Sequence, residues 1–244
     1  MRAYAYSVAG PLGVFALWEL VVRAFGVPVY VLPAPSAIAM KVATDTAVMA
    51  EGLGLTLMEA VVGYVVGSAI ALSLAIAFVL APRLERVGLP ALVALNSVPV
   101  VAFAPVALLW FGSGPASKIA LVTMAVGFAV FVNAHQGLRS VDEAAANLLR
   151  SFGAGPLRQM ALLRLPAALP SIMNGLRVAV VRSMIVAIVA EMLAAFKGLG
   201  ATIFESTQQI DFLRAWAAIA VASLASMIWY GIVNWIDHRF VFWR

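Results

Sequence analysis

Two ionisable residues inside a long apolar segment are the first candidates for chemistry. Arg182 falls near the middle of the segment 168–195, and Glu191 falls near its end. A charged side chain at the centre of a membrane-embedded helix costs about 2.5–3.5 kcal/mol on insertion scales, so its presence needs a reason. Arg182 could attract an anion in a path between helices, or it could pair with a carboxylate on another helix. Glu191 could line the same path or act as a structural hydrogen-bonding partner.

Three uncharged polar residues, Asn96, Ser97 and Thr123, are further candidates for lining a path, and a role in packing is again the alternative. The chain offers little for metal chemistry, because His135 and His238 are far apart and there is no cysteine. We therefore expect no metal site and no cofactor bound by this chain.

The motifs of two enzyme classes are also missing. A phosphate-binding loop, G-x-x-x-x-G-K followed by Ser or Thr, is not present, and the nearest segment, GSGPASK at 112–118, has the wrong spacing. An intramembrane protease of the rhomboid type would need a serine in a G-x-S-x-G-like motif and a partnering histidine inside the membrane, and no such set occurs. We predict that the chain has no catalytic residues and that energy for any active process comes from another chain.

The composition is that of a membrane protein. Hydrophobic residues make up 64% of the 244 residues and charged residues 11%, and the mean hydropathy is +1.02. Soluble domains have about 45–50% apolar and about 25% charged residues, so this surplus cannot be hidden in one soluble core. The net charge is +5, but the Lys and Arg residues stand at the ends of apolar runs. This placement is typical of topology signals and argues against nucleic-acid binding.

Six segments are long and apolar enough to span a bilayer, which takes about 20 residues. Because only helices and closed barrels satisfy the backbone in hydrocarbon, and these runs are too long for barrel strands, we predict an all-α polytopic bundle formed by a single domain, 1–244. The predicted spans are about 7–25, 53–80, 89–111, 117–138, 168–195 and 213–236.

The distribution of Lys and Arg predicts the orientation. With six spans both termini share a side, and that side holds nine basic residues against five on the other. The nine are Arg2, Arg83, Arg86, Arg139, Arg150, Arg158, Arg164, Arg239 and Arg244, and the five are Arg23, Lys41, Lys118, Lys197 and Arg214. We expect both termini and the segment 139–166 to be cytoplasmic.

Two spans contain packing signals, and one contains a charge pair. Gly63, Gly67 and Ala71 recur every four residues, which favours close helix packing. The third span carries Pro99 and Pro105, each of which removes a backbone donor and bends a helix. Glu19 and Arg23, one turn apart in the first span, are expected to pair.

The segment 139–166 is a polar insert patterned like two short helices. An apolar stripe at i, i+4, i+7, i+8 and i+11 begins at Val141 and ends at Phe152, which predicts an amphipathic helix of about three turns. Gly153 marks its end and Pro156 can open the next helix over 156–164. On these features alone, the first helix could lie on a lipid surface or insert into a groove of a soluble partner.

The insert resembles the cytoplasmic loop of ABC-transporter permeases of the binding-protein-dependent import class. The pattern of that loop is E-A-A, three residues, Gly, nine residues and I-x-L-P. Here nine residues separate Gly153 from Leu163-Arg164-Leu165-Pro166. The literal Glu143-Ala144-Ala145 lies four residues too early, so the Glu position of the pattern falls on Asn147 and its two Ala on Leu148 and Leu149.

The resemblance covers about residues 50–244. LNSVPVVAFAPVALLWFGSG, GLRSVD, LPAALPSIMNGLRVAVVRSMIVAIVAEML and the GLG at 198–200 are similar to the nitrate/sulfonate/taurine-type branch. That branch also includes permeases for vitamin-precursor heterocycles, so the solute stays open between such heterocycles and small anions.

The resemblance implies a type I importer permease in a bacterial or archaeal cytoplasmic membrane. It implies a second permease copy, most simply identical, a cytoplasmic ATPase dimer that binds ATP and Mg²⁺, and an external solute-binding protein. Leu148, Leu149 and Phe152 would contact the ATPase, Arg150 would pair with acidic groups there, and Gly153 would set the turn. The implied coupling set is Asn147, Leu148, Leu149, Arg150, Phe152, Gly153, Leu163 and Pro166.

Two alternatives remain. The residues of the coupling set could pack only against the cytoplasmic ends of the bundle itself. The chain could also be a secondary transporter or channel, although such a protein would more typically show inverted repeats and offers no explanation for the two-helix insert.

Overall fold

The computed structural model describes residues 2–194 and 196–240, and the regular structure in these ranges is helical. Residue 195, the last of the fifth expected span, and Arg244 lie outside the described residues. The α-helices are α1 (Arg2–Ala24), α2 (Pro35–Thr44), α3 (Thr46–Leu80), α4 (Pro82–Asn96), α5 (Ala104–Phe111), α6 (Pro115–Arg139), α7 (Glu143–Ser151), α8 (Pro156–Gln159), α9 (Leu165–Ala194), α10 (Leu199–Gln208) and α11 (Phe212–Phe240). A 3₁₀ turn (Val100–Phe103) precedes α5, and a π-helical turn (Met160–Arg164) joins α8 to α9.

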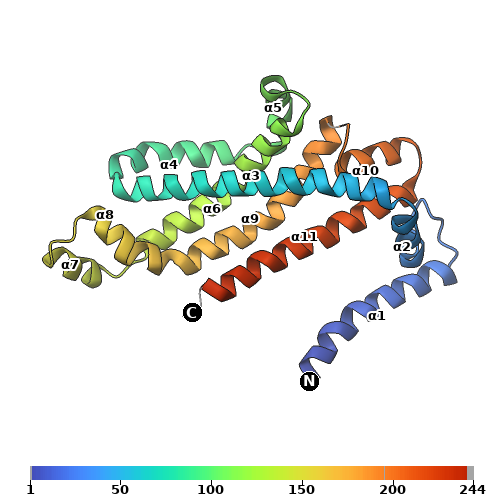
Figure 1. Ribbon diagram of the computed structural model, residues 1–244, viewed down its shortest axis with the longest axis horizontal. Helices are drawn as coiled ribbons and strands as arrows, with labels where there is room; N and C mark the ends of the chain where they lie inside the picture. Colours follow the sequence, from blue (N-terminus) through green and yellow to red (C-terminus); the bar gives the residue numbers. More distant parts are fainter. Residues whose placement is uncertain (1, 195, 241–244) are drawn as a thin grey trace.

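The centre of the molecule is formed by α3, α6 and α9, which pack against one another (Figure 1). The predicted small-residue face of α3 is confirmed as a packing face. A Cβ on Gly63 would lie 2.6 Å from the Val122 Cβ, and one on Gly67 would lie 2.7 Å from the Thr123 carbonyl oxygen. The backbones of α3 and α6 therefore approach too closely for larger residues at these positions.

The contact between α6 and α9 uses glycine from both helices. A Cβ on Gly137 of α6 would lie 2.7 Å from the Ser171 Cβ, and one on Gly175 of α9 would lie 2.8 Å from the Asn133 Cβ. α6 is consequently enclosed on two sides, and its valines at 122, 126 and 130 are fully buried.

The third predicted span, 89–111, is not one helix. α4 starts earlier, at Pro82, and ends at Asn96, and the chain bends by 89° before it continues through the 3₁₀ turn into α5. Pro99 lies at the break, where it cannot donate a backbone hydrogen bond and disfavours helical geometry in the residue before it. The sequence indicated kinks at the prolines but did not predict that the helix is interrupted.

The other predicted spans coincide with helices to within a few residues, except that α3 begins seven residues before the predicted 53. By length and composition, three of the described helices could cross a membrane: α3, α6 and Phe212–Arg239 of α11. The bent pair of α4 with the segment Val100–Phe111 adds a fourth if it is counted as one broken span.

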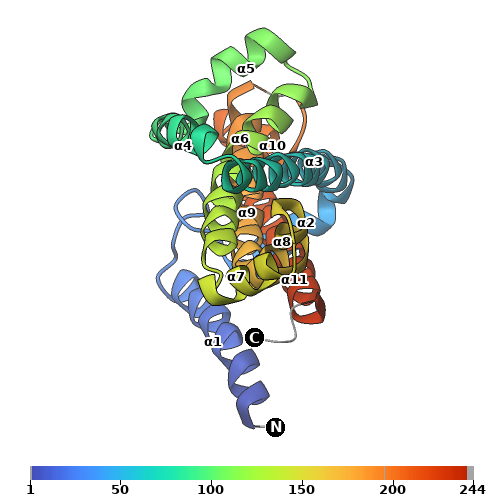
Figure 2. The same cartoon turned by 90° about the vertical axis from the view of Figure 1, so that its left-hand side faces the viewer.

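The two ends of the molecule differ. α7 and α8 lie at one end, beyond the central helices, and α2 and α10 lie at the other (Figures 1 and 2). The N-terminal end of α1 and the C-terminal end of α11 both point toward the α7 end (Figure 1).

α1 stands apart from the central helices, as Figures 1 and 2 show from two directions. Glu19 pairs with Arg23 at 2.6 Å, as predicted, and its carboxylate also accepts hydrogen bonds from the backbone N–H and hydroxyl of Ser36. Trp18 meets Trp216 of α11 edge to face, with ring centroids 6.1 Å apart. These contacts attach α1 to α2 and α11.

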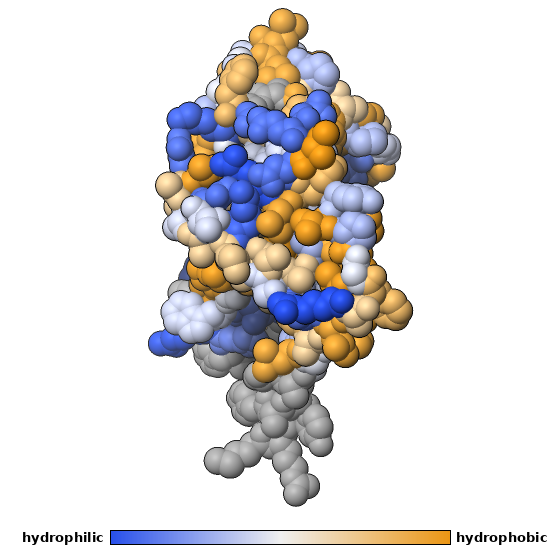
Figure 3. All heavy atoms as spheres, turned by 90° about the vertical axis from the view of Figure 1, so that its right-hand side faces the viewer, coloured by the Kyte–Doolittle hydropathy of each residue, from blue (hydrophilic) through white to orange (hydrophobic). Residues whose placement is uncertain are grey.

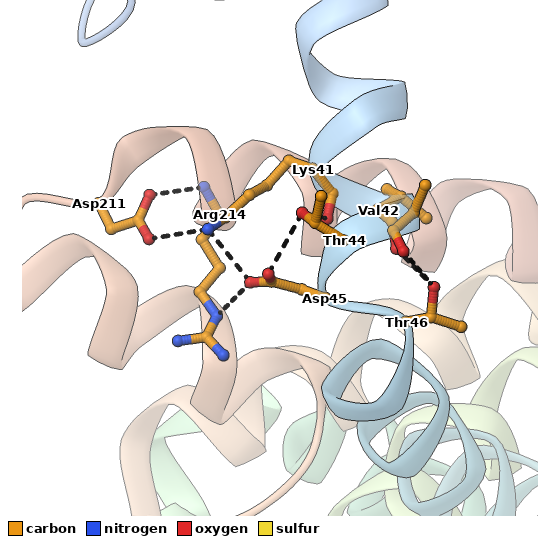
Figure 4. Close-up of polar contacts among 8 residues, drawn as sticks. Lys41, Val42, Thr44, Asp45, Thr46, Asp211 and Arg214 are labelled. Atoms are coloured by element: carbon orange, nitrogen blue, oxygen red, sulfur yellow. Dashed lines mark hydrogen bonds and ion pairs between the residues drawn. The ribbon is translucent and has the colours of Figure 1, made fainter.

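Ion pairs fix α2 at the α10 end of the molecule (Figure 4). Lys41 lies 3.2 Å from a carboxylate oxygen of Asp45 and 3.5 Å from one of Asp211, and Arg214 lies 3.0 Å from Asp45. The two acidic and two basic residues join α2 and the start of α3 to the start of α11. This end presents hydrophilic side chains beside hydrophobic ones (Figure 3).

The glycine contacts lead to a stability prediction. Gly63→Ala should destabilise the fold by about 1–3 kcal/mol because its Cβ would overlap Val122. Gly54→Ala is the control on the same helix, and it should be neutral or stabilising by up to about 1 kcal/mol, because no atom lies within 4 Å of the place that its Cβ would take. Thermal unfolding of the two purified variants in detergent measures the difference, and equal melting temperatures would contradict the proposed close packing.

Candidate functional site

A cavity of about 550 Å³ lies between α3, α4, α6 and α9, beside the break in the third span. Most of its wall is apolar, with Phe128 and Phe131 of α6 among the lining residues. The polar side chains at the wall are those of Asn96, Thr123 and Arg182. Three of the five residues predicted to line a path thus come together here from three different helices.

Among the charged residues of α9, Arg182 differs from Arg177 and Glu191 in having no partner within residues 2–194 and 196–240. In the part of the chain that the structure describes, its guanidinium makes no hydrogen bond or ion pair, and the residue is exposed. Arg177, five residues earlier, is instead 3.2 Å from Asp237 and is hydrogen-bonded to Asn174. The alternative that Arg182 is neutralised by a carboxylate on another helix is therefore not what the structure shows.

Arg182 also borders a second cavity, of about 500 Å³, on the outer side of α9. The side chains around it include those of Asn174, Arg177 and Tyr230. Arg182 thus lines two cavities, one inside the helical bundle and one at its surface.

The remaining two predicted path residues lie elsewhere. Ser97 ends α4, where its hydroxyl donates to the Val93 carbonyl at 2.9 Å, and it does not line the cavity. Glu191 is fully buried at the α10 end of α9 and does not line the cavity either.

Glu191 acts as a hydrogen-bond acceptor for the start of α10. Its carboxylate accepts from the Gly200 N–H at 2.7 Å and from the Thr56 hydroxyl at 2.8 Å, and that hydroxyl in turn accepts from the Leu199 N–H at 3.0 Å. Gly198 has φ +114°, and a Cβ there or on Gly200 would overlap Glu191. The GLG segment at 198–200 is therefore required by the close approach of this carboxylate.

Two more ionisable residues, Glu59 of α3 and Lys118 of α6, are buried near Glu191. The sequence analysis did not single out Glu59 and counted Lys118 only as an orientation signal. Lys118 donates to the carbonyl oxygens of Ser113 and Gly114. The signal for Glu59 was present, because it is the only acidic residue between positions 52 and 84. These side chains join four helices at the α10 end of the bundle.

An exposed ion pair lies at the surface of the same end. Lys197 donates to the Glu51 carboxylate at 2.6 Å, and this hydrogen bond raises the pKa of the Lys197 amine above its ordinary value. Both side chains are largely exposed, so the pair contributes little to stability.

The polar insert forms the predicted amphipathic helix. Asp142 caps α7 by accepting from the Ala144 N–H at 3.1 Å, and Gly153 ends it with φ +77°. Leu148 and Phe152 are 59% and 76% exposed, whereas Leu149 is half-buried. The fully covered residue of α7 is Ala146, which the predicted stripe did not include. Asn147 and Arg150 are exposed.

The second half of the insert differs from the predicted helix over 156–164. α8 ends at Gln159, and a π-helical turn leads directly into α9, where Pro166 and Pro170 occupy the first turns. Pro166 cannot donate to a carbonyl in the preceding turn, and the π-helical turn just before it is a local adjustment of the kind that membrane helices make near proline. Pro166 is exposed and Leu163 half-buried.

Two hydrogen bonds anchor this half to the bundle and to the turn that follows α7. Arg164 donates to the Leu138 carbonyl of α6 at 2.9 Å, and the buried Gln159 donates to the Ala154 carbonyl at 2.7 Å. The segment that follows α7 is therefore fixed to the bundle, and Leu148 and Phe152 remain exposed on α7.

Comparisons with known proteins agree with this arrangement. Residues 63–242 match the family described as binding-protein-dependent transport system inner membrane component. The chain is 32% identical over 225 residues to a probable ABC transporter permease protein of Haemophilus influenzae, with 92% of each chain covered. It is also 32% identical over 239 residues to the formylaminopyrimidine transport permease protein ThiX of Halalkalibacterium halodurans, covering 96% of this chain and 93% of that one.

The chain belongs to this permease family. Its fold is similar to that of an amino acid ABC transporter, with a TM-score of 0.64 at 17% identity over 82% of this chain and 97% of the other. A similar match is found with the methionine ABC transporter MetNI, with a TM-score of 0.62 at 14% identity over 80% and 95% of the two chains. The predicted all-α, type I permease architecture is thereby confirmed.

The permease is a transport subunit of an ATP-driven importer, and ATP hydrolysis takes place in a separate subunit. Membership of the family also implies that the permease lies in a membrane. It implies two kinds of partner, an ATPase and a solute-binding protein. The sequence-based predictions of the family, the fold and the transport function are confirmed.

The buried carboxylate yields a second stability prediction. Glu191→Gln should destabilise the permease by about 1–3 kcal/mol because an amide offers one acceptor oxygen where Gly200 and Thr56 supply two donors. Glu205→Gln is the matched control, since Glu205 is exposed on α10. Thermal unfolding in nanodiscs measures both, and a Glu191→Gln variant as stable as the control would refute the assigned hydrogen bonds.

Proposed function

We propose that two identical copies of the permease form the translocation path of an importer in the cytoplasmic membrane, and that an ATPase subunit binds each copy through α7. The observation that carries this proposal is the exposure of Leu148 and Phe152 on a short helix beyond the apolar bundle. Large apolar side chains in this position, outside the spanning helices, fit insertion into a groove of a soluble partner. Arg150, exposed on the same helix, is available to acidic groups at the rim.

The connection of α7 to α9 supports a role of the insert in transmitting movement from the ATPase to the bundle. α8, the π-helical turn and α9 follow one another without a break, so a displacement of the insert passes directly into the helix that carries Arg182. Gly153 sets the turn between α7 and this segment, and Leu163 and Pro166 lie where the segment enters the bundle. In the proposed cycle, closure of the ATPases on ATP and Mg²⁺ moves α7 and tilts α9.

The proposed orientation places both termini and α7 in the cytoplasm. The ends of α1 and α11 that carry the termini point toward the α7 end (Figure 1), and that end holds the larger share of basic residues. The α10 end then faces outward, where its mixed hydrophilic surface is available to a solute-binding protein (Figure 3).

The proposed pairing of two copies rests on the surface of α9. Val178, Val181 and Ile185 form an exposed apolar stripe, and Arg182 lies within it. An arginine facing lipid near the middle of a span is costly, so this face of α9 fits contact with protein or with an aqueous path. A second copy placed there would close the outer cavity.

The proposed path includes the central cavity with Asn96, Thr123 and Arg182. The solute is a small organic molecule, either an anion or a heterocycle. Relatives of both kinds occur, such as the aliphatic sulfonates permease SsuC of Bacillus subtilis, at 27% identity, and ThiX, at 32%.

Replacing the exposed apolar residues of α7 tests the docking. Leu148→Asp and Phe152→Asp should each weaken ATPase binding by about 2 kcal/mol or more, roughly thirtyfold in Kd, because a charge would replace the group buried in the partner. Co-purification of the ATPase with the membrane-embedded permease measures the effect.

Leu84→Asp is the matched control, because Leu84 is 48% exposed at the start of α4. It should leave ATPase binding unchanged. Normal co-purification of both α7 variants would show that the ATPase binds elsewhere, and solute uptake that continues without any ATPase would instead favour a secondary transporter.

A further inference from the structure

We propose that the permease itself selects its solute by charge, and that Arg182 is the residue that binds the anionic group of a small organic anion during passage. This inference rests on the proposed function, in which the solute crosses through the central cavity. It assigns to the permease a discrimination step that follows release from the solute-binding protein.

The first argument is the state of the guanidinium. Arginine stays charged under all physiological conditions and carries five N–H donors in a planar fork that matches an oxyanion. In the described part of the chain, the fork of Arg182 has no acceptor, although a charge in the middle of a predicted span calls for one. A passing anion supplies the missing acceptor.

The second argument is the absence of competing acids. None of the described residues that line either cavity next to Arg182 is an aspartate or a glutamate. Arg177, which also lines the outer cavity, is paired with Asp237 at 3.2 Å. Both cavities are therefore positively charged, and Arg182 remains available to a solute.

The third argument concerns the rest of the solute. The central cavity is walled mainly by aliphatic and aromatic side chains, such as Leu92, Leu95, Phe128 and Phe131, while Asn96 and Thr123 provide the other polar groups. A volume of about 550 Å³ suits a small molecule with an apolar body. An inorganic ion would leave this wall uncovered. A neutral heterocycle could accept hydrogen bonds from the guanidinium but would bring no negative charge to balance it.

The shared position of Arg182 suggests how the anion moves on. Because the side chain borders both cavities, it can keep a hydrogen bond to the anionic group while the body of the solute passes from one cavity to the other. A binding site for transport must be weak enough to release its solute, and a single cation with two polar neighbours meets that requirement better than a fully enclosed site.

The test compares an anion with a neutral molecule that has the same body. Butanesulfonate and butanesulfonamide are titrated onto the permease–ATPase complex in nanodiscs, without solute-binding protein, and binding is followed by saturation-transfer NMR. Wild type should bind butanesulfonate at least about tenfold more tightly than the sulfonamide, because the hydrogen bonds to Arg182 are then charge-assisted. Arg182→Gln should abolish this preference.

Two variants control the experiment. Arg182→Lys keeps the charge but loses the fork, so part of the preference should remain. Arg214→Gln removes the same charge from the ion-pair cluster of Figure 4, away from both cavities, and should bind like wild type. The inference is overturned if wild type shows no preference for the anion, or if Arg182→Gln keeps the preference. It is also overturned if Arg214→Gln loses the preference together with Arg182→Gln.

The outcome is separable from that of the proposed function. ATPase docking depends on α7, so Arg182→Gln should co-purify with the ATPase as wild type does. Intact assembly with unchanged butanesulfonate binding would refute the role of Arg182 and leave the docking proposal in place. If ATPase binding does not depend on Leu148 and Phe152, the docking proposal is refuted, and this conclusion does not depend on the result for anion binding.

Discussion

The close contact of α6 with α3 and α9 is the constraint from which the other features of the permease follow. Helices in a membrane gain little from the hydrophobic effect, so their association depends on packing and on polar contacts between them. Gly63 and Gly67 let α3 approach one side of α6, and Gly137 and Gly175 let α9 approach the other. The three helices then form a rigid centre, and the cavity lies where α4 and the broken segment after Asn96 complete its wall.

Within this centre, charged side chains fall into two groups according to their partners. Glu191 receives donors from two other segments of the chain, and Arg177 has Asp237, so the cost of removing each from water is offset locally. Arg182 lies on the same helix, has no such partner among the residues that the structure describes, and lines a cavity. The first group holds helices together, whereas Arg182 lies on a cavity wall, where we propose that it meets a solute.

One continuous helical segment connects the exposed insert with the cavity. α8, the π-helical turn and α9 form a continuous segment from Pro156 to Ala194, and Arg164 and Gln159 hold its beginning in place. At the other end of α9, Glu191 holds the start of α10. α9 therefore contacts the elements at both ends of the molecule and carries Arg182 between them. We infer that this helix couples the two ends.

The sequence by itself determined the membrane class, the approximate extents of α1, α6, α9 and α11, the small-residue packing face of α3 and the amphipathic insert. These properties depend on hydropathy, residue size and spacing along one helix, and all three can be read locally. It did not reveal the break before Pro99, the π-helical turn before Pro166, or the burial of Glu59 and Lys118. Nor did it show that Glu191 has hydrogen-bond partners whereas Arg182 has none among the described residues, because the two looked alike as charges in one apolar run. Only the tertiary structure decided this difference, because segments distant in sequence bring a buried charge its partner.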